Sequence, residues 1–207
     1  MFELFKEVNK ATVAKLAFLQ VFIIVLSNYL VNIPAEAFGI KITYSSFTFP
    51  LLILATDLTV RILGKGIARR VIAISYPFAI IGSVAVVMFG GAPDSVAYRI
   101  GIASATAYLI GSLLDVYVFQ IVREKLTHLW WPAPLISTVI ANAIDGYTFM
   151  GIAFSNSADE YMASHWVEIA TSELFIKTSI GIIVFLPIYG VLLKVISGAI
   201  KKEEPTT

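Results

Sequence analysis

The sequence predicts an all-α integral membrane protein with six transmembrane helices and with both termini in the cytoplasm. Hydrophobic residues make up 58% of the 207 residues and charged residues only 14%, whereas soluble domains carry about 25% charged residues. With a mean hydropathy of +0.85, the chain has too few polar side chains to cover a soluble protein of this size. The apolar residues also fall into six runs of about 20 residues, the length that crosses a bilayer as a helix.

The first two runs need separate justification. Lys6, Lys10 and Lys15 lie before or at the start of residues 13–33, and Ala35-Glu36-Ala37 follows the run, a pattern that a cleaved signal peptide would share. The apolar run is too long for such a peptide, so we expect an uncleaved helix. Residues 47–64 form the least apolar run because they contain Asp57 and Arg61. Pro50 suits the first turn of this second helix, since a proline there removes no helical hydrogen bond.

The remaining four runs are cleaner, and the segments between them are short. They cover about 71–90, 99–121, 132–154 and 170–194. Such short loops leave no room for a soluble domain, so we expect residues 1–207 to form a single transmembrane domain. The longest external loop, about 155–168, is expected to carry a short interfacial helix.

The basic residues are distributed unevenly, and this asymmetry predicts the orientation because cytoplasmic segments are enriched in Lys and Arg. If the N-terminus is cytoplasmic, the external loops hold only Lys41 and Arg99, and the last span holds Lys177. The other 12 of the 15 basic residues then lie inside: Lys6, Lys10, Lys15, Arg61, Lys65, Arg69, Arg70, Arg123, Lys125, Lys194, Lys201 and Lys202.

Several function classes are excluded by what the sequence lacks. The chain has no cysteine and two histidines, which removes disulfides, thiolate ligands and Cys nucleophiles and argues against a zinc or haem site. A net charge of +1 leaves no polybasic surface for nucleic acid. Phosphate-binding and hydrolase motifs are absent, and His128 and His165 fall at predicted membrane edges. We therefore expect no enzyme, no catalytic residue, no metal and no cofactor.

Four acidic residues lie inside predicted spans, accompanied by two basic residues, and an ionisable residue there costs roughly 2.5–3.5 kcal/mol on insertion scales unless it is paired or hydrated. They are Asp57, Arg61, Asp115, Asp145, Glu173 and Lys177. Asp57 with Arg61, and Glu173 with Lys177, have i,i+4 spacing with the acid first, which places each pair on one helix face. Each pair either lines a polar site or simply neutralises itself for insertion.

The two remaining acids have no oppositely charged residue at helical spacing. Asp145 follows Asn142 by one turn, and a carboxylate with a carboxamide can accept and donate hydrogen bonds to a polar ligand. The alternative is an interhelical hydrogen bond that packs helices. Asp115, in the inner third of the fourth span, is a candidate for proton binding or gating, or is an interface residue. Inward aromatic residues beside these acids would suit a flat heteroaromatic ligand.

One segment is long enough to indicate a family. Residues 47–64 read FTFPLLILATDLTVRILG and closely resemble the signature of the queuosine precursor transporter family of vitamin-uptake-like membrane proteins. Five other segments agree with it in order and spacing, so the resemblance covers nearly the whole chain. They are 25–34 (VLSNYLVNIP), 113–119 (LLDVYVF), 130–145 (WWPAPLISTVIANAID), 160–170 (EYMASHWVEIA) and 175–193 (FIKTSIGIIVFLPIYGVLL).

The resemblance implies a six-helix, multi-pass carrier of the cell inner membrane. Such a carrier imports 7-deazaguanine precursors of queuosine, in the 7-cyano and 7-aminomethyl forms, for tRNA modification. A deazaguanine presents N1–H and the 2-amino group as adjacent donors that one carboxylate can accept, while O6 accepts from a carboxamide or a cation. Asp145 or Asp57 would then hold the donor edge, and Asn142 the O6 or pyrrole edge. The substrate-binding candidates are Asp57, Arg61, Asn142, Asp145, Glu173 and Lys177.

Other functions are compatible with the same residues. A substrate-binding subunit of an energy-coupling-factor type importer would also be small, six-helical and without an ATPase, and Ala11, Ala14 and Ala17 offer a small-residue face for its partner. A structural or assembly protein would use the charges only to pair helices. The expected partners are a 7-deazaguanine and the lipid bilayer. The sequence permits a homodimer without establishing one, and leaves proton coupling and uncoupled diffusion open.

Overall fold

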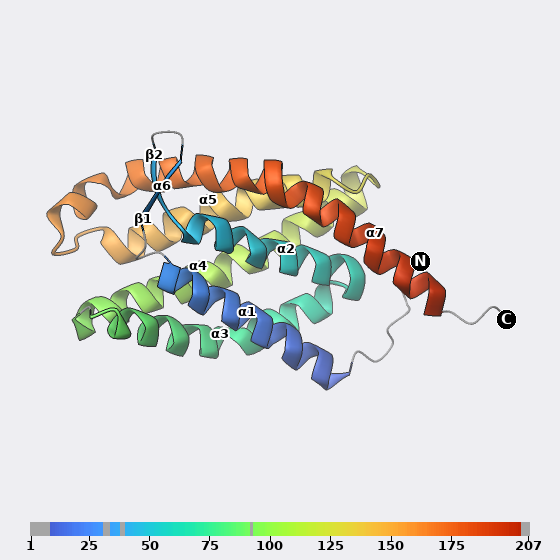
Figure 1. Ribbon diagram of the computed structural model, residues 1–207, viewed down its shortest axis with the longest axis horizontal. Helices are drawn as coiled ribbons and strands as arrows, with labels where there is room; N and C mark the ends of the chain where they lie inside the picture. The colour runs from blue at the N-terminus through green and yellow to red at the C-terminus, as the bar shows by residue number, and fades with distance from the viewer. Residues whose placement is uncertain (1–8, 31–33, 38–39, 92, 204–207) are drawn as a thin grey trace.

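The computed structural model describes residues 9–30, 34–37, 40–91 and 93–203. Within them, six helical rods run along a common long axis and reverse direction from one to the next (Figure 1). The rods are α1 (Lys10–Leu30), α2 (Ser45–Leu63), α3 (Lys65–Phe89), α4 (Asp94–Ile121) continued by the π-helical turn η1 (Val122–Leu126), α5 (Pro132–Phe154), and α6 (Glu160–Ile180) continued by the π-helical turn η2 (Gly181–Phe185) and α7 (Leu186–Glu203).

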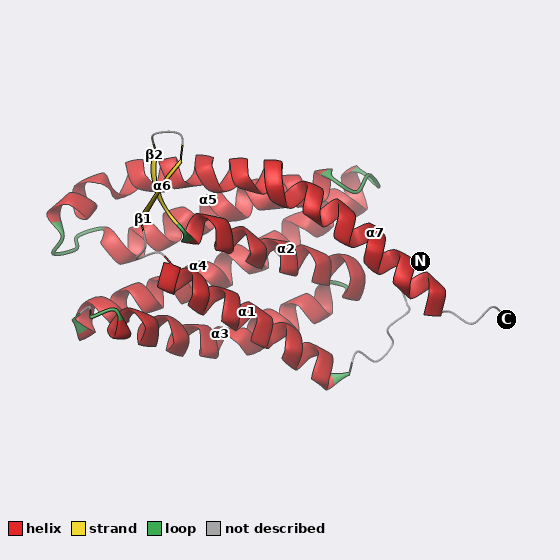
Figure 2. Cartoon of the chain, in the orientation of Figure 1, coloured by secondary structure: helices red, strands yellow, loops and turns green. Residues whose placement is uncertain are grey.

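A short hairpin joins α1 to α2 and was not predicted from the sequence. Strand β1 (Pro34–Ala37) pairs antiparallel with β2 (Ile40–Thr43), with Pro34 opposite Thr43 (Figure 2). The hairpin marks one end of the bundle, here called the hairpin end. The start of α1 and the end of α7 mark the other, here called the terminal end (Figure 1).

Five helical segments in the described part of the chain are long and apolar enough to cross a membrane. They are Lys10–Leu30, Lys65–Phe89, Asp94–Leu126, Pro132–Phe154 and Glu160–Ile196. The predicted second span is not among them. Its helix, α2, carries hydroxyl and charged side chains, of which Thr56, Asp57 and Thr59 are buried against other helices. A helix enclosed by protein needs no continuous apolar surface.

Other predicted boundaries hold to differing degrees. The fifth span coincides with α5, whereas α2 begins at Ser45, so Pro50 lies inside the helix rather than in its first turn. The expected separate helix in 155–168 is wrong, because the sixth rod already begins at Glu160. Its first turn is capped by Asp159, whose carboxylate accepts a hydrogen bond from the Met162 backbone N–H at 3.0 Å. Residues 31–33 of the predicted first span lie outside the described residues.

Buried polar contacts fix α1 against its neighbours. Tyr108 Oη of α4 donates to Gln20 Oε1 at 2.7 Å, and Gln20 Nε2 donates to Thr56 Oγ1 of α2 at 3.1 Å. Ser75 Oγ of α3 lies 3.4 Å from the same Gln20 oxygen. A second set lies nearer the hairpin end, where Asn28 donates to Ser83 at 2.6 Å and accepts from Ser104 at 3.1 Å. These contacts join α1, α2, α3 and α4 into one packed group.

The fold gathers the basic residues at one end. Lys6 lies outside the described residues, but the rest of the predicted inner set belongs to helix segments at or near the terminal end. These are Lys10 and Lys15 on α1, Arg61 on α2, Lys65, Arg69 and Arg70 on α3, Arg123 and Lys125 on η1, and Lys194, Lys201 and Lys202 on α7.

Candidate functional site

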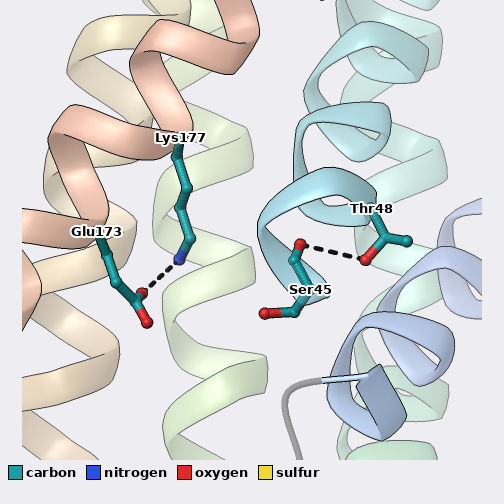
Figure 3. Close-up of polar contacts among 4 residues, drawn as sticks. All are labelled: Ser45, Thr48, Glu173 and Lys177. Carbon is teal, nitrogen blue, oxygen red and sulfur yellow. Dashed lines mark hydrogen bonds and ion pairs between the residues drawn. The ribbon is translucent and has the colours of Figure 1, made fainter. Parts of the chain in front are cut away.

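Lys177 of α6 is the centre of a polar cluster towards the hairpin end. Its Nζ donates to Glu173 Oε2 at 2.8 Å, one turn earlier on the same helix (Figure 3). This confirms that the predicted i,i+4 pair forms. Asp145 of α5 is a second carboxylate close enough to interact electrostatically with Lys177. Lys177 is therefore hydrogen-bonded to one carboxylate and attracted electrostatically by a second on a neighbouring helix, an arrangement that helical spacing alone did not predict.

A cavity of about 50 Å³ opens beside this cluster. Both carboxylates and Lys177 line it, together with Phe149, which follows Asp145 by one helical turn. Small polar residues of α1, α2 and α4 complete the wall: Ser27, Asn28, Ser45 and Ser104. Sequence reasoning missed these four, because serine and asparagine in a membrane helix carry no signal that separates a cavity wall from ordinary packing. The cavity thus offers anionic, cationic, hydroxyl and aromatic groups at one place.

A second acidic cluster lies at the centre of the bundle. Asp57 of α2 and Asp115 of α4 are 2% and 1% exposed and are neighbours, with Ser137 of α5 beside both. Ser137 Oγ donates to Asp57 Oδ1 at 3.3 Å. Neither carboxylate oxygen of Asp115 has a hydrogen-bond partner among the described residues. Asp115 is therefore enclosed by other helices rather than exposed on the surface of the bundle.

The predicted pairing of Asp57 with Arg61 is wrong for the described structure. Asp57 turns towards α4 and α5, whereas Arg61 lines a cavity of about 420 Å³ at the terminal end. Other helices thus decide which way each side chain of this i,i+4 pair turns. Lys65, Arg123 and His128 line the same cavity, and the Nη1 atom of Arg61 is buried there without a hydrogen-bond partner among the described residues.

A small central cavity connects the two acidic clusters. It measures about 10 Å³ and is lined by Asp115 and Asp145, so Asp145 contacts both this cavity and the one at the hairpin end. Gly111 of α4 permits the approach, because a Cβ atom there would lie 3.2 Å from the Cβ atom of Asp145. From the hairpin end towards the middle of the bundle, the acids therefore follow in the order Asp145 of α5, Asp115 of α4 and Asp57 of α2.

Asn142 is 1% exposed on α5, and neither its Nδ2 nor its Oδ1 has a hydrogen-bond partner among the described residues. The packing hydrogen bond that was the alternative for this residue is therefore not formed within the described part of the chain. Buried carboxamides are usually hydrogen-bonded. Asn142, whose two polar atoms have no such bond among the described residues, can therefore still form hydrogen bonds one helical turn from Asp145.

Comparison with known proteins places the chain in a family. Residues 43–192, from the end of β2 to α7, match the family described as "Putative vitamin uptake transporter". The "Probable queuosine precursor transporter" of Haemophilus influenzae is 40% identical over 204 residues, which cover 87% of this chain and 86% of that protein. The "Queuosine precursor transporter" of Escherichia coli is 41% identical over 192 residues, with the same two shares. No solved structure matches.

The matched region contains both acidic clusters, the central cavity and the cavity at the terminal end, and most of the lining of the hairpin-end cavity, to which Ser27 and Asn28 of α1 contribute from outside the match. The two relatives are named as transporters, and the apolar helices fit a multi-pass membrane protein. The chain therefore belongs to the vitamin uptake transporter family and is a membrane transporter rather than an enzyme.

Proposed function

We propose that this chain imports queuosine precursors, the 7-cyano and 7-aminomethyl 7-deazaguanines, across the cell inner membrane for tRNA modification. The observation that carries the proposal is the identity of about 40% over most of the chain to two relatives that are named queuosine precursor transporters. The basic terminal end supports a cytoplasmic position for both termini, by the positive-inside rule. Residues 1–207 would then act as one transporter domain.

The hairpin-end cavity supplies the chemistry that such a base requires. Asp145 would accept N1–H and the 2-amino group, a bidentate contact that a carboxylate suits. Asn142 or Lys177 would donate to O6, and Phe149 would stack on the ring face. Glu173 holds Lys177 at 2.8 Å and so positions the donor. Asp57 and Arg61 are proposed as later contacts, on the way to the large cavity at the terminal end.

The size of the cavity places a condition on this mechanism. A volume of about 50 Å³ holds a few water molecules, since one water needs about 10–15 Å³ of such space, and not a bicyclic base. The helices around Lys177 must therefore separate to admit the substrate, which is what alternating access demands. This conformation is proposed as one in which the site is closed towards the hairpin end.

The test is uptake of labelled 7-cyano-7-deazaguanine by cells that lack both synthesis and import of the base, complemented with this chain. Wild type is expected to restore queuosine in tRNA, and Asp145→Asn to abolish uptake although the protein still inserts. Asp94→Asn, an exposed acid at the start of α4, is the matched control and should transport normally. Normal uptake by Asp145→Asn would remove Asp145 from the binding edge, whereas no uptake by wild type would contradict the function itself.

The energy-coupling-factor alternative receives less support. It relied on Ala11, Ala14 and Ala17 as one partner-binding face, but Ala17 is 4% exposed and packs with Val71 of α3. Uptake by the purified chain alone in proteoliposomes would exclude this alternative, because a binding subunit needs its ATPase partners to transport. The same preparation would show whether the protein is a homodimer. We also propose a homodimer, because the small-residue faces of the helices permit one.

A further inference from the structure

We propose that Asp115 binds the proton that drives import, and that Asp145 delivers this proton from the hairpin-end cavity. The inference rests on the proposed function, because it names how that transport is powered. In the proposed cycle Asp115 binds only the proton and never contacts the base. The evidence is the geometry around this side chain.

The surroundings of Asp115 favour the binding of a proton by its carboxylate. Its two carboxylate oxygens are buried and accept no hydrogen bond from the described residues, yet the carboxylate of Asp57 is its neighbour. Two ionised carboxylates in contact repel strongly in a low-dielectric interior. One proton shared by the pair removes one charge and creates an O–H donor between the two groups. Acids that pair within a membrane are typical of proton relays.

The cavity at Asp115 is too small for anything larger. At about 10 Å³ it approaches the smallest volume that holds one water molecule, and no heteroaromatic ring fits there. The ligand of Asp115 is thus a proton or a water molecule that carries one. Thr56 and Ser112 line the same space and can orient such a water with their hydroxyl groups.

Asp145 provides the connection to the outside. It lines both the central cavity and the hairpin-end cavity, and Gly111 removes the side chain that would otherwise separate it from α4. In the proposed cycle a proton enters at the hairpin end, passes from Asp145 to Asp115, and is shared with Asp57. When the base reaches Asp57, that carboxylate must be ionised to accept the N–H donors, so the proton leaves towards the terminal end.

Other groups that could titrate lie on the elements packed around Asp115. Asp57 on α2, Asp145 on α5 and Tyr189 on α7 surround Asp115. Arg61 and Arg123 lie beyond them at the terminal end. The buried residues of α3 include no ionisable side chain. Among the acids, Asp57 already accepts a hydrogen bond from Ser137 and Asp145 already interacts with Lys177, whereas neither oxygen of Asp115 accepts a hydrogen bond from the described residues, and its neighbour Asp57 carries the same charge.

The test separates coupling from substrate binding in proteoliposomes that contain the full chain. Accumulation of labelled 7-cyano-7-deazaguanine is measured with an outside-acid pH gradient and a clamped membrane potential, and exchange against unlabelled base is measured without a gradient. A gradient of about one pH unit supports about tenfold accumulation if one proton accompanies each base, since one unit corresponds to a factor of ten. Wild type should reach this level and lose it when a protonophore is added.

The decisive variant is Asp115→Asn. We expect it to lose gradient-driven accumulation, to retain exchange within about threefold of wild type, and to exchange at a rate that no longer depends on pH. Asp94→Asn is the matched control on the same helix and should behave as wild type. Asp115→Glu keeps a titratable group and should retain accumulation, so the proposal stays testable if the Asn variant does not fold.

Several results would overturn the proposal. Wild-type exchange that ignores the pH gradient, or accumulation driven by a sodium gradient instead, would refute proton coupling and leave the proposed function standing. Loss of exchange in a folded Asp115→Asn protein would place this residue in the substrate site. If wild type exchanges no 7-deazaguanine at all, the proposed function itself fails.

Discussion

At the scale of single residues, Lys177 balances two carboxylates, and its removal should expose both. Lys177→Met leaves the buried Asp145 and the partly exposed Glu173, whose side chain is 26% exposed, without their cation, and removing one partner of a buried pair costs up to about 3–5 kcal/mol. We expect a lower melting temperature in detergent and uptake reduced by about tenfold or more, as for the loss of a charged hydrogen bond. Lys125→Met, at an exposed position of η1, should change neither measurement.

A double variant distinguishes a structural ion pair from a functional one. Lys177→Met combined with Glu173→Leu removes the hydrogen-bonded ion pair as a unit, which is often neutral for stability, and leaves Asp145 as the one carboxylate without its cation. We expect the melting temperature to recover in part while uptake stays low. Recovery of both would show that the pair serves only insertion and packing.

Gln20 supports a second residue-scale prediction. Gln20→Ala leaves the buried Tyr108 hydroxyl without its acceptor and removes the donor to Thr56, which still donates to the Leu52 carbonyl, and an unsatisfied buried group costs about 1–3 kcal/mol. The variant should unfold at a lower temperature in detergent, with its substrate preference unchanged. Gln120→Ala is the control, because the hydrogen bond that Gln120 donates to Glu124 is exposed on the protein surface rather than buried. Equal melting temperatures for the two variants would contradict a stabilising role for the network.

At the scale of elements, the contact between α3 and α4 depends on a missing side chain. A Cβ atom at Gly101 would lie 2.4 Å from Val84 Cγ2 and 2.9 Å from the Val84 backbone nitrogen. The backbone cannot rotate away as a side chain can, so Gly101→Ala must push the helices apart at a cost of about 1–3 kcal/mol. Thermal unfolding should reveal the loss. Gly66→Ala meets no atom within 4 Å and should be neutral, and an equally stable Gly101→Ala protein would contradict the close packing.

Hydropathy predicted the helix boundaries well where the helices face lipid. It predicted them poorly where contacts with the rest of the protein or a capping residue set the boundary. The fifth span was predicted to the residue, because its boundaries coincide with Pro132 and with the polar turn after Phe154. The start of the sixth rod was missed, since Glu160 and Glu168 resemble a loop by polarity although Asp159 caps a helix there. The hairpin was missed because eight paired residues, Pro34–Ala37 and Ile40–Thr43, are too few to produce a periodic signal.

At the scale of the whole molecule, the candidate site was only partly predictable. Ionisable residues in apolar runs are conspicuous, so Asp57, Asp115, Asp145 and Lys177 could be named from the sequence. Their partners could not, because pairing between helices depends on rotation and depth that spacing does not encode. Asp57 meets Asp115 rather than Arg61 for this reason. The sequence thus predicted the charges, and the fold divides them into two clusters and a basic cavity.

Orientation is a property of the whole molecule, and the absence of cysteine in the chain makes it directly testable. Lys125→Cys at the terminal end and Ala158→Cys in the turn between α5 and α6 each introduce one thiol at an exposed position. Because basic segments remain on the cytoplasmic side, a membrane-impermeant maleimide should label Ala158→Cys in intact spheroplasts. It should label Lys125→Cys only after the membrane is permeabilised. The wild-type chain is the unlabelled control, and the reverse pattern would place both termini outside the cell and reverse the direction in which the proposed proton path runs.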